Sequence, residues 1–162
     1  MLPERQRREK IRTLARQLEN TDWFVRSEAV KELGKIGKPT LPLLARTLKD
    51  KTNSVRVSTV EALGTIEHEA VLPHLAQALQ DKNEVVRIVT VETLEKIARR
   101  LQGKNVESKE ARALQFVVPY FRENEHWQVF QKAFQAALKG KITEKNARLY
   151  LKQLRAMKGN LK

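Results

Sequence analysis

The sequence predicts an all-α protein, a right-handed α-α superhelix of stacked helical repeats. Three windows of sixteen residues, 11–26, 41–56 and 72–87, carry one pattern without a gap. Each reads apolar-x-x-Leu-Ala-x-x-Leu-x-(Asp/Asn), then four residues, then Val-Arg. The windows begin 30 and 31 residues apart. A period of this size indicates a helical array, because each unit buries its apolar face against its neighbours.

Each repeat is expected to hold two amphipathic helices. In the first helix of the second repeat, Leu41, Leu44 and Leu48 follow the i, i+3, i+7 spacing of one helix face. Pro42 and its equivalent Pro73 fall where a first helical turn tolerates proline, because the N–H groups of that turn lack intrahelical partners. Both prolines therefore predict the starts of helices.

The second helix of each repeat carries an apolar stripe, with Glu32 as the one clear polar departure. Gly34, Gly37 and Gly64 predict helix ends or close packing between helices. The stripes are Val25, Ala29, Glu32, Leu33 and Ile36 in the first repeat, Val55, Thr59, Ala62, Leu63 and Ile66 in the second, and Val86, Thr90, Thr93, Leu94 and Ile97 in the third.

Two further features mark the repeats: the segments Leu33-Gly34-Lys35-Ile36 and Leu63-Gly64-Thr65-Ile66, and a polar pair six residues apart. The pairs are Asn20 with Arg26, Asp50 with Arg56, and Asp81 with Arg87. On these residues the stretch 11–101 resembles the HEAT repeat, in the short form of the phycobilisome-lyase-like subfamily. The resemblance implies that the pairs form a ladder of hydrogen bonds between repeats, an internal brace rather than an anion-binding stripe. Asn20 leaves the first rung without its carboxylate, and Glu95 replaces the glycine in the third repeat.

The remaining chain departs from the period. The stretch after the third repeat contains Gly103 and few apolar residues, so it predicts a loop, with the next helix starting near Ser108. A helix from about Thr143 to Met157 is expected to pack Ala147, Tyr150, Leu151 and Leu154. We expect one domain, divided into a basic N-terminal arm or helix start (1–10), three HEAT-like repeats (11–101), a loop (102–112), a degenerate fourth repeat (113–140) and a basic C-terminal helix (141–162).

Composition narrows the class of protein. The chain has 162 residues, a net charge of +13 and no cysteine, which excludes disulfides and cysteine-based metal or nucleophile chemistry. No apolar run approaches the roughly 20 residues of a membrane span, so we expect a cytoplasmic protein. Neither a cofactor nor a metal site is expected. The one His68-Glu69 pair lies in a turn, whereas the HEAT-repeat deoxyhypusine hydroxylases need several such pairs facing each other.

The positive charge gathers at the two ends of the chain. Residues 127–162 carry +8 and the first twelve residues carry +3, which leaves +2 for the rest. The terminal cations have three open interpretations: a solvated face, a contact with nucleic-acid phosphate, or a contact with an acidic protein or membrane surface. The residues expected to bind an anion, near one side of the last helix, are Lys141, Lys145, Arg148, Lys152 and Arg155.

The outward positions of the second helices suggest a different site. Removing the buried stripes leaves equivalent rows, Phe24/Ser54/Val85 and Ser27/Val57/Ile88, that are unexpectedly apolar for a surface in water. Contiguous exposed apolar patches mark interaction sites. The predicted partner-binding residues are Trp23, Phe24, Val57, Val85 and Ile88, flanked by Glu61 and Glu92.

No catalytic constellation is present in the sequence. Trp23 is a single candidate for the channel tryptophan of the HEAT-like alkylpurine DNA glycosylases. We therefore predict a non-catalytic scaffold that binds a protein partner in a concave groove. The alternatives are a nucleic-acid-binding protein that uses the basic C-terminal helix, and an enzyme subunit related to the bilin lyases. The identity of the partner and the oligomeric state stay open.

Overall fold

The computed structural model describes residues 3–102, 104–118, 127–143 and 145–156. Within these ranges all regular elements are helices, which confirms the all-α prediction. The chain divides into two compact units, Met1–Thr93 and Leu94–Lys162, called unit 1 and unit 2 below. The boundary between these units falls inside the third repeat, within α6 (Glu84–Leu101), and the expectation of one domain stays a prediction.

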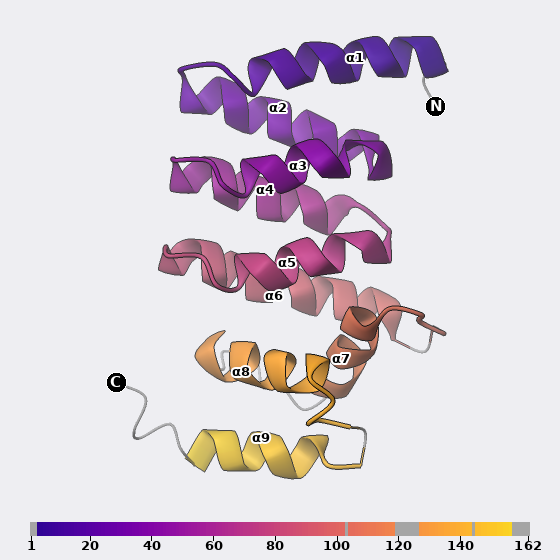
Figure 1. Cartoon of the computed structure of the whole chain (residues 1–162), viewed down its shortest axis with the longest axis vertical. Coiled ribbons are helices and arrows are strands. Elements are labelled where there is room, and N and C mark those ends of the chain that lie inside the picture. Colours follow the sequence, from indigo (N-terminus) through magenta and orange to yellow (C-terminus); the bar gives the residue numbers. More distant parts are fainter. Residues whose placement is uncertain (1–2, 103, 119–126, 144, 157–162) are drawn as a thin grey trace. The chain divides into compact units, whose positions relative to one another are not determined.

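Unit 1 is an α-α solenoid of helical pairs (Figure 1). The first helices of the pairs form one layer and the second helices form another. The chain enters the first helix at residue 4, so its basic start belongs to a helix. The first helices are α1 (Glu4–Gln17), α3 (Leu41–Thr47) and α5 (Leu72–Ala78). The second helices are α2 (Trp23–Ile36), α4 (Asn53–Thr65) and the start of α6. Two short 3-10 turns, η1 (Lys38–Thr40) and η2 (Glu69–Val71), precede α3 and α5.

The helix ends of unit 1 follow from their sequence. Pro42 and Pro73 lie in the first turns of α3 and α5, as predicted. Gly37 ends α2 with a φ of 88°, a left-handed backbone that glycine adopts without steric cost. The buried Thr40 hydroxyl lies within hydrogen-bond distance of the carbonyl oxygens of Leu33, at 2.9 Å, and Gly37, at 2.8 Å, so it joins η1 to the end of α2.

Much of the core of unit 1 comes from the predicted stripes, since Leu33 and Leu63 are completely buried. Val30 and Val60, which the predicted stripes did not include, are completely buried as well, and the most extensive packing is between α2 and α4. The helices approach closely because glycine lies at the contact. A Cβ atom on Gly34 would lie 2.8 Å from the Cβ of Ala62, closer than real Cβ atoms come. The equivalent contact, from Gly64 to Thr93, would be 2.6 Å.

Unit 2 contains the end of α6, then α7 (Lys109–Val117), α8 (Trp127–Leu138) and α9 (Ala147–Ala156). Helix α7 packs on α8, and α8 packs on α9. Phe130 and Phe134 are fully buried with their rings stacked, 6.0 Å between centroids. Ile142, between α8 and α9, is also buried. The core of unit 2 therefore uses bulkier side chains than the repeats do.

Two predicted boundaries in unit 2 need correction. The loop expected over 102–112 is partly helical, because α7 begins at Lys109. Ser108 caps that helix, since its Oγ accepts the N–H of Ala111 at 3.1 Å, close to the predicted start. The last helix begins at Ala147 rather than near Thr143. A turn precedes it, in which Asn146 Oδ1 accepts the N–H of Thr143 at 2.7 Å.

Candidate functional site

The conserved spacing of Arg and Asp in the repeats produces a ladder of buried ion pairs in unit 1. Arg26 Nε and Nη2 donate to the two carboxylate oxygens of Asp50 at 2.8 and 3.0 Å. The same guanidinium donates from Nη1 to the main-chain oxygens of Asn20 and Thr21 at 2.8 and 3.0 Å. The side chains of Arg26 and Asp50 are 5% and 12% exposed. The planar fork of arginine is thus fully used inside the protein.

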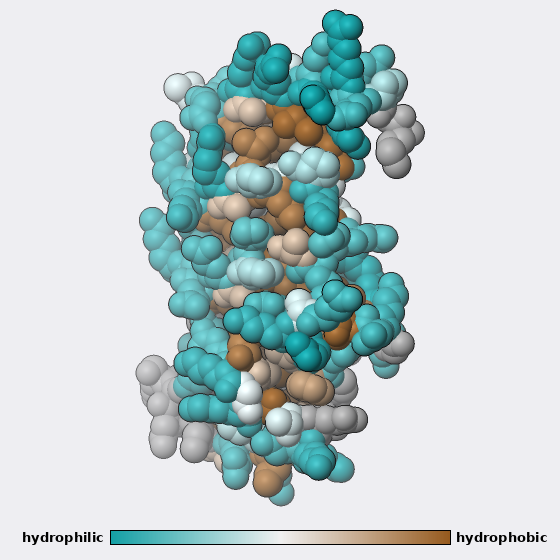
Figure 2. Space-filling model, turned by 45° about the vertical axis from the view of Figure 1, so that its right-hand side comes forward, coloured by the Kyte–Doolittle hydropathy of each residue, from teal (hydrophilic) through white to brown (hydrophobic). Residues whose placement is uncertain are grey.

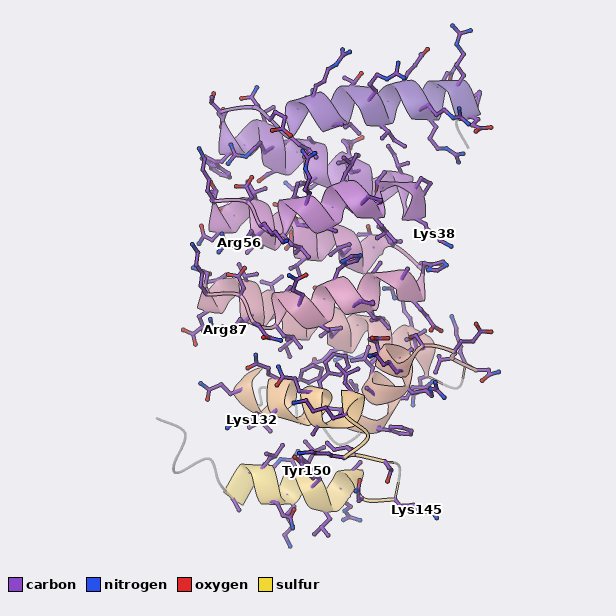
Figure 3. All side chains as sticks on the ribbon, in the orientation of Figure 1. Lys38, Arg56, Arg87, Lys132, Lys145 and Tyr150 are labelled. Carbon is purple, nitrogen blue, oxygen red and sulfur yellow. The ribbon has the colours of Figure 1, made fainter. Side chains whose placement is uncertain are left out.

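The second rung repeats this geometry. Arg56 donates from Nε and Nη2 to the carboxylate of Asp81 at 2.7 and 2.9 Å, and from Nη1 to the main-chain oxygen of Asp50 at 2.8 Å. Arg87 Nη1 donates to the main-chain oxygen of Asp81 at 2.6 Å. In Figure 3, Arg56 and Arg87 lie one above the other along the edge of unit 1 where the turns within repeats lie, and Lys38 lies at the opposite edge.

The ladder differs from the pairing that the sequence suggested. Arg26, Arg56 and Arg87 each bond the main chain of the residue six positions earlier. The carboxylates that Arg26 and Arg56 bind belong to the next repeat. The expectation that Asn20 would deprive Arg26 of a charged partner is therefore wrong, because Asp50 supplies it. The side chain of Asn20 has another role: its Oδ1 accepts the N–H of Asp22 at 2.9 Å and shapes the turn.

The electrostatics of the rungs favour the ionised pair. Burial alone would raise the pKa of Asp50, but the hydrogen bonds from Arg26 and from the N–H of Thr52, together with the nearby positive charge, hold that pKa below its ordinary value. The same balance lowers the pKa of Asp81, with Arg56 and the N–H of Asn83 as donors. These contacts support an internal brace. Each guanidinium nitrogen of Arg26 and Arg56 already donates to an oxygen of the protein, so neither fork is free to bind a ligand.

The clearest exposed apolar feature lies at the start of α2. Trp23 and Phe24 are its first two residues and are 48% and 57% exposed. Their rings meet edge to face, 6.0 Å apart at the centroids and 88° between planes. Asp22 caps the helix, because its carboxylate accepts the N–H of Phe24 at 2.9 Å. The cap fixes the backbone that carries both rings at the turn edge of unit 1.

A second apolar spot lies at the start of α6. Val85 and Ile88 are 53% and 40% exposed and are neighbours at i, i+3 on one helix face. Ser54, the equivalent of Phe24 and Val85 in the second repeat, is half-buried between the two spots. Stacked helix axes lie roughly 8–10 Å apart, so Phe24 and Val85 are roughly 16–20 Å apart. The predicted contiguous patch is therefore two spots. On the face that Figure 2 presents, apolar side chains of unit 1 gather in groups along the middle, between polar side chains at both edges.

The row Ser27/Val57/Ile88 does not face solvent as a whole. Residues seven apart lie on nearly the same helix face, so Ser27 and Val57 share the faces of Gly34 and Gly64 that touch the next repeat. Ser27 is only 3% exposed and Val57 is half-buried, which corrects the prediction that both are open surface. The apolar site therefore consists of Trp23, Phe24, Val85 and Ile88.

A charged band runs beside this apolar site. Lys31, Glu61 and Glu92 occupy equivalent positions one or two turns further along the second helices, and all three are exposed. Lys31 forms an ion pair with Glu28 at 2.7 Å, both side chains half-exposed. Glu61 and Glu92 lie one turn beyond Val57 and Ile88 on their helices, and their part in a partner-binding site stays a prediction.

The predicted anion-binding residues are only partly gathered on one helix. Lys141 and Lys145 precede α9, so the expected i, i+4 row that begins at Lys141 is wrong. Arg148 and Lys152 are exposed on α9, and Arg155 is half-buried. Figure 3 shows Lys145 at the start of α9, away from Lys132 on α8.

Unit 2 as a whole is strongly basic, and its last helix packs much as predicted. Its sequence has sixteen Lys and Arg against six Glu, a net charge of +10, whereas unit 1 carries +3. Ala147 and Leu151 are buried and Tyr150 is half-buried, so the inner stripe of the last helix is as predicted. Leu149 is 60% exposed, an apolar side chain outside that stripe.

The histidines and a pocket among the described residues are candidate sites of chemistry. No group of three His, Cys, Asp or Glu among them is placed to hold a metal ion. His68 Nδ1 accepts the N–H of Ala70 at 3.0 Å and so caps a turn. A pocket of about 460 Å³ in unit 2 is lined by residues such as Arg99, Leu114 and Gln115, with no carboxylate, histidine or hydroxyl among those described. In the same described ranges, each helix is too short or too polar to cross a membrane.

The comparison with protein families agrees with this geometry. The family model described as HEAT repeats matches residues 1–58 and 41–139, most of the chain. The match goes no further than HEAT repeats, so the finer resemblance to the phycobilisome-lyase-like subfamily stays a prediction. No curated protein matches the chain.

Proposed function

We propose that this chain, which belongs to the HEAT-repeat family, is a non-catalytic scaffold that binds a protein partner through the apolar site of Trp23, Phe24, Val85 and Ile88. The observation that carries the proposal is the aromatic pair at the start of α2. Two large rings, each about half exposed, lie beside a cap that holds them in place. Tryptophan is enriched among the residues that dominate binding at protein interfaces.

The remaining features of this surface suit an extended partner. Two apolar spots separated by roughly 16–20 Å favour a segment that crosses the stacked second helices. Glu61 and Glu92 lie beside that path and would favour basic groups on the partner. Such charges steer association and fix register more than they add affinity.

The test is an affinity capture from the native source with three matched baits. The wild-type chain should capture a partner that the Trp23→Ser/Phe24→Ser variant loses. The Leu149→Ser variant is the control, because it removes an exposed apolar side chain from unit 2. If the aromatic variant retains every protein that the wild type captures, the apolar site is not a partner surface.

A second candidate rests on the +10 charge of unit 2. Under this candidate, Lys141, Lys145, Arg148, Lys152 and Arg155 contact an anionic polymer such as nucleic acid. Each phosphate neutralised on duplex DNA adds about −0.9 to the slope of log K against log salt, so four contacts give roughly −3.6. Titration of a labelled duplex with the wild type and with a Lys141→Gln/Lys152→Gln variant tests this, and an unchanged slope excludes the two lysines.

A further inference from the structure

The outer face of α1 carries a row of arginines that neither candidate function uses. Arg5, Arg8, Arg12 and Arg16 follow one another at intervals of three, four and four residues, so they share one helix face. Leu14, on the opposite face, is buried against the rest of unit 1. All four arginines are exposed.

Half of this row has no ionic partner within the described part of the chain. Arg5 pairs with Glu9 at 3.5 Å, and Arg8 pairs with Glu4. Those side chains are highly exposed, and such surface pairs stabilise little, so an external anion can displace them. Arg12 and Arg16 form no ion pair with any described residue.

The inward cation of the same helix behaves differently. Lys10 donates to the carboxylate of Glu32 on α2 at 2.8 Å, so it joins the first helix to the second. The structural ion pair of α1 is thus made by a lysine on its flank, and the outer arginines are not needed to hold the helix.

The choice of arginine is itself informative. Helix α1 contains five Arg and one Lys, whereas residues 127–162 contain seven Lys and two Arg. A face that only keeps a protein in solution needs charge, and lysine is the more strongly hydrated cation. Arginine adds a planar fork that binds phosphate through two parallel hydrogen bonds. The arginine row is therefore better suited to binding phosphate than to only keeping the protein in solution.

The rest of the face argues for a polymer backbone as the ligand. Every exposed residue of α1 is polar, so it offers no aromatic anchor for a protein interface, no ring on which an unpaired base can stack, and no apolar side chain to enter a membrane. The eleven helical steps from Arg5 to Arg16 span roughly 16 Å at 1.5 Å per step. One strand of a duplex presents a phosphate about every 3.4 Å, so roughly five lie alongside.

We propose that the arginine row of α1 binds the phosphate backbone of double-stranded nucleic acid without reading its sequence. Phosphate contacts of this kind position a protein on a duplex and carry no base information. The row uses none of the residues of the apolar site at Trp23 and none of the cations of unit 2, so it stands or falls independently of both candidates.

The test uses the whole chain and a fluorescently labelled 20-base-pair DNA duplex, followed by anisotropy at several salt concentrations. If four arginines each meet a phosphate, the slope of log K against log salt should be about −3.6. Replacing Arg12→Gln/Arg16→Gln should reduce its magnitude by about 1.8. The Arg12→Lys/Arg16→Lys variant keeps the charge and should keep the slope but weaken binding, because the forks are lost. A second duplex of unrelated sequence should bind equally.

The control variant Lys141→Gln/Lys145→Gln removes the same charge from unit 2. Equal losses in the two glutamine variants would overturn the proposal, because binding would then depend on net charge alone. It would also be overturned if the duplex does not bind at about 50 mM salt, or if phosphatidylserine vesicles bind and the duplex does not. Circular dichroism melts of each variant confirm that the helices are intact.

Discussion

Unit 1 and unit 2 are built from helices of similar length but are held together differently. In unit 1 each repeat contacts the next through a buried Arg–Asp rung and a glycine that lets the helices approach. In the described part of unit 2 the core depends on Phe130 and Phe134, and no buried Arg–carboxylate pair of this kind is present. Regular repeats can reuse one interface because each element meets the same partner surface again.

The boundary between the two units coincides with a change in sequence. The glycine that follows the core leucine in the first two repeats is replaced in the third by Glu95, which forms an ion pair with Arg99 at 3.7 Å. A side chain of that size would not fit where a single Cβ already clashes. The close glycine contact between neighbouring repeats is therefore lost at the residue after Leu94, where unit 2 begins.

The largest expected effect comes from breaking a rung of unit 1. Arg56→Ala leaves the Asp81 carboxylate and the Asp50 carbonyl buried without their donor, and removal of one partner of a buried pair costs roughly 3–5 kcal/mol. The matched control is Arg46→Ala, which removes an exposed pair with Glu19 and should cost less than about 1 kcal/mol. Urea unfolding followed by circular dichroism measures both.

A double variant measures how much of this loss comes from leaving one charge of the Arg56–Asp81 pair without its partner. Arg56→Met/Asp81→Leu removes both charges and should recover most of the loss, because buried ion pairs are often replaceable by apolar side chains. It should remain about 1 kcal/mol below the wild type, since the Asp50 carbonyl still lacks its hydrogen bond. If Arg56→Ala unfolds at the same urea concentration as the wild type, the ladder is not a brace.

The next prediction compares the loss of stability when one glycine of each unit is replaced by asparagine. Gly34→Asn must push against Ala62, including its backbone, so it should destabilise unit 1 by about 1–3 kcal/mol or more. Gly140 in unit 2 has a φ of 70° and open space around it, and asparagine tolerates that backbone, so Gly140→Asn should be close to neutral. Thermal melts that rank the two variants the other way would contradict the packing role of Gly34.

These contrasts show what the sequence was able to predict. The period and most of the buried stripes follow from spacing, because spacing fixes which face of a helix a residue occupies. The ladder was implied by the resemblance to the HEAT repeat. The carboxylate partner of Arg26 did not follow, because Asn20 meets Arg26 only through its main-chain oxygen and the carboxylate comes from Asp50 in the next repeat. A pattern within one repeat carries no information about which repeat supplies a partner.

The candidate sites were predictable to a lesser degree. Phe24 and Val85 are exposed as expected. Val57 is half-buried instead, because its position on α4 lies against the following repeat. Lys141 was expected in a helix that begins only at Ala147, since charged and turn residues give weak signals for helix starts. Exposure on a repeat surface depends on the neighbouring helix, which sequence spacing alone does not place.

A pair of lysine variants sharpens this last point. Val57→Lys puts a charge at a half-buried position between repeats and should cost about 1–2 kcal/mol, whereas Ile88→Lys, at the equivalent but exposed position, should stay within about 0.5 kcal/mol. Urea unfolding compares the two directly. Equal costs would mean that both positions face the same environment, and the assignment of Val57 to the inter-repeat face would be wrong.

The smallest effect concerns the link between the first two helices and is seen only in acid. The hydrogen bond from Lys10, followed by that from Lys35, lowers the pKa of Glu32 from 4.5 to about 2. A carboxylate whose pKa is lower in the folded state stabilises fully above its unfolded pKa and loses that contribution as pH falls through the folded value. The melting temperature of the wild type should therefore fall between about pH 4.5 and pH 2 partly through Glu32. Glu32→Gln should make that fall shallower while lowering stability slightly at pH 7. Parallel profiles for the wild type and Glu32→Gln would show that the contact between α1 and α2 does not depend on this charge.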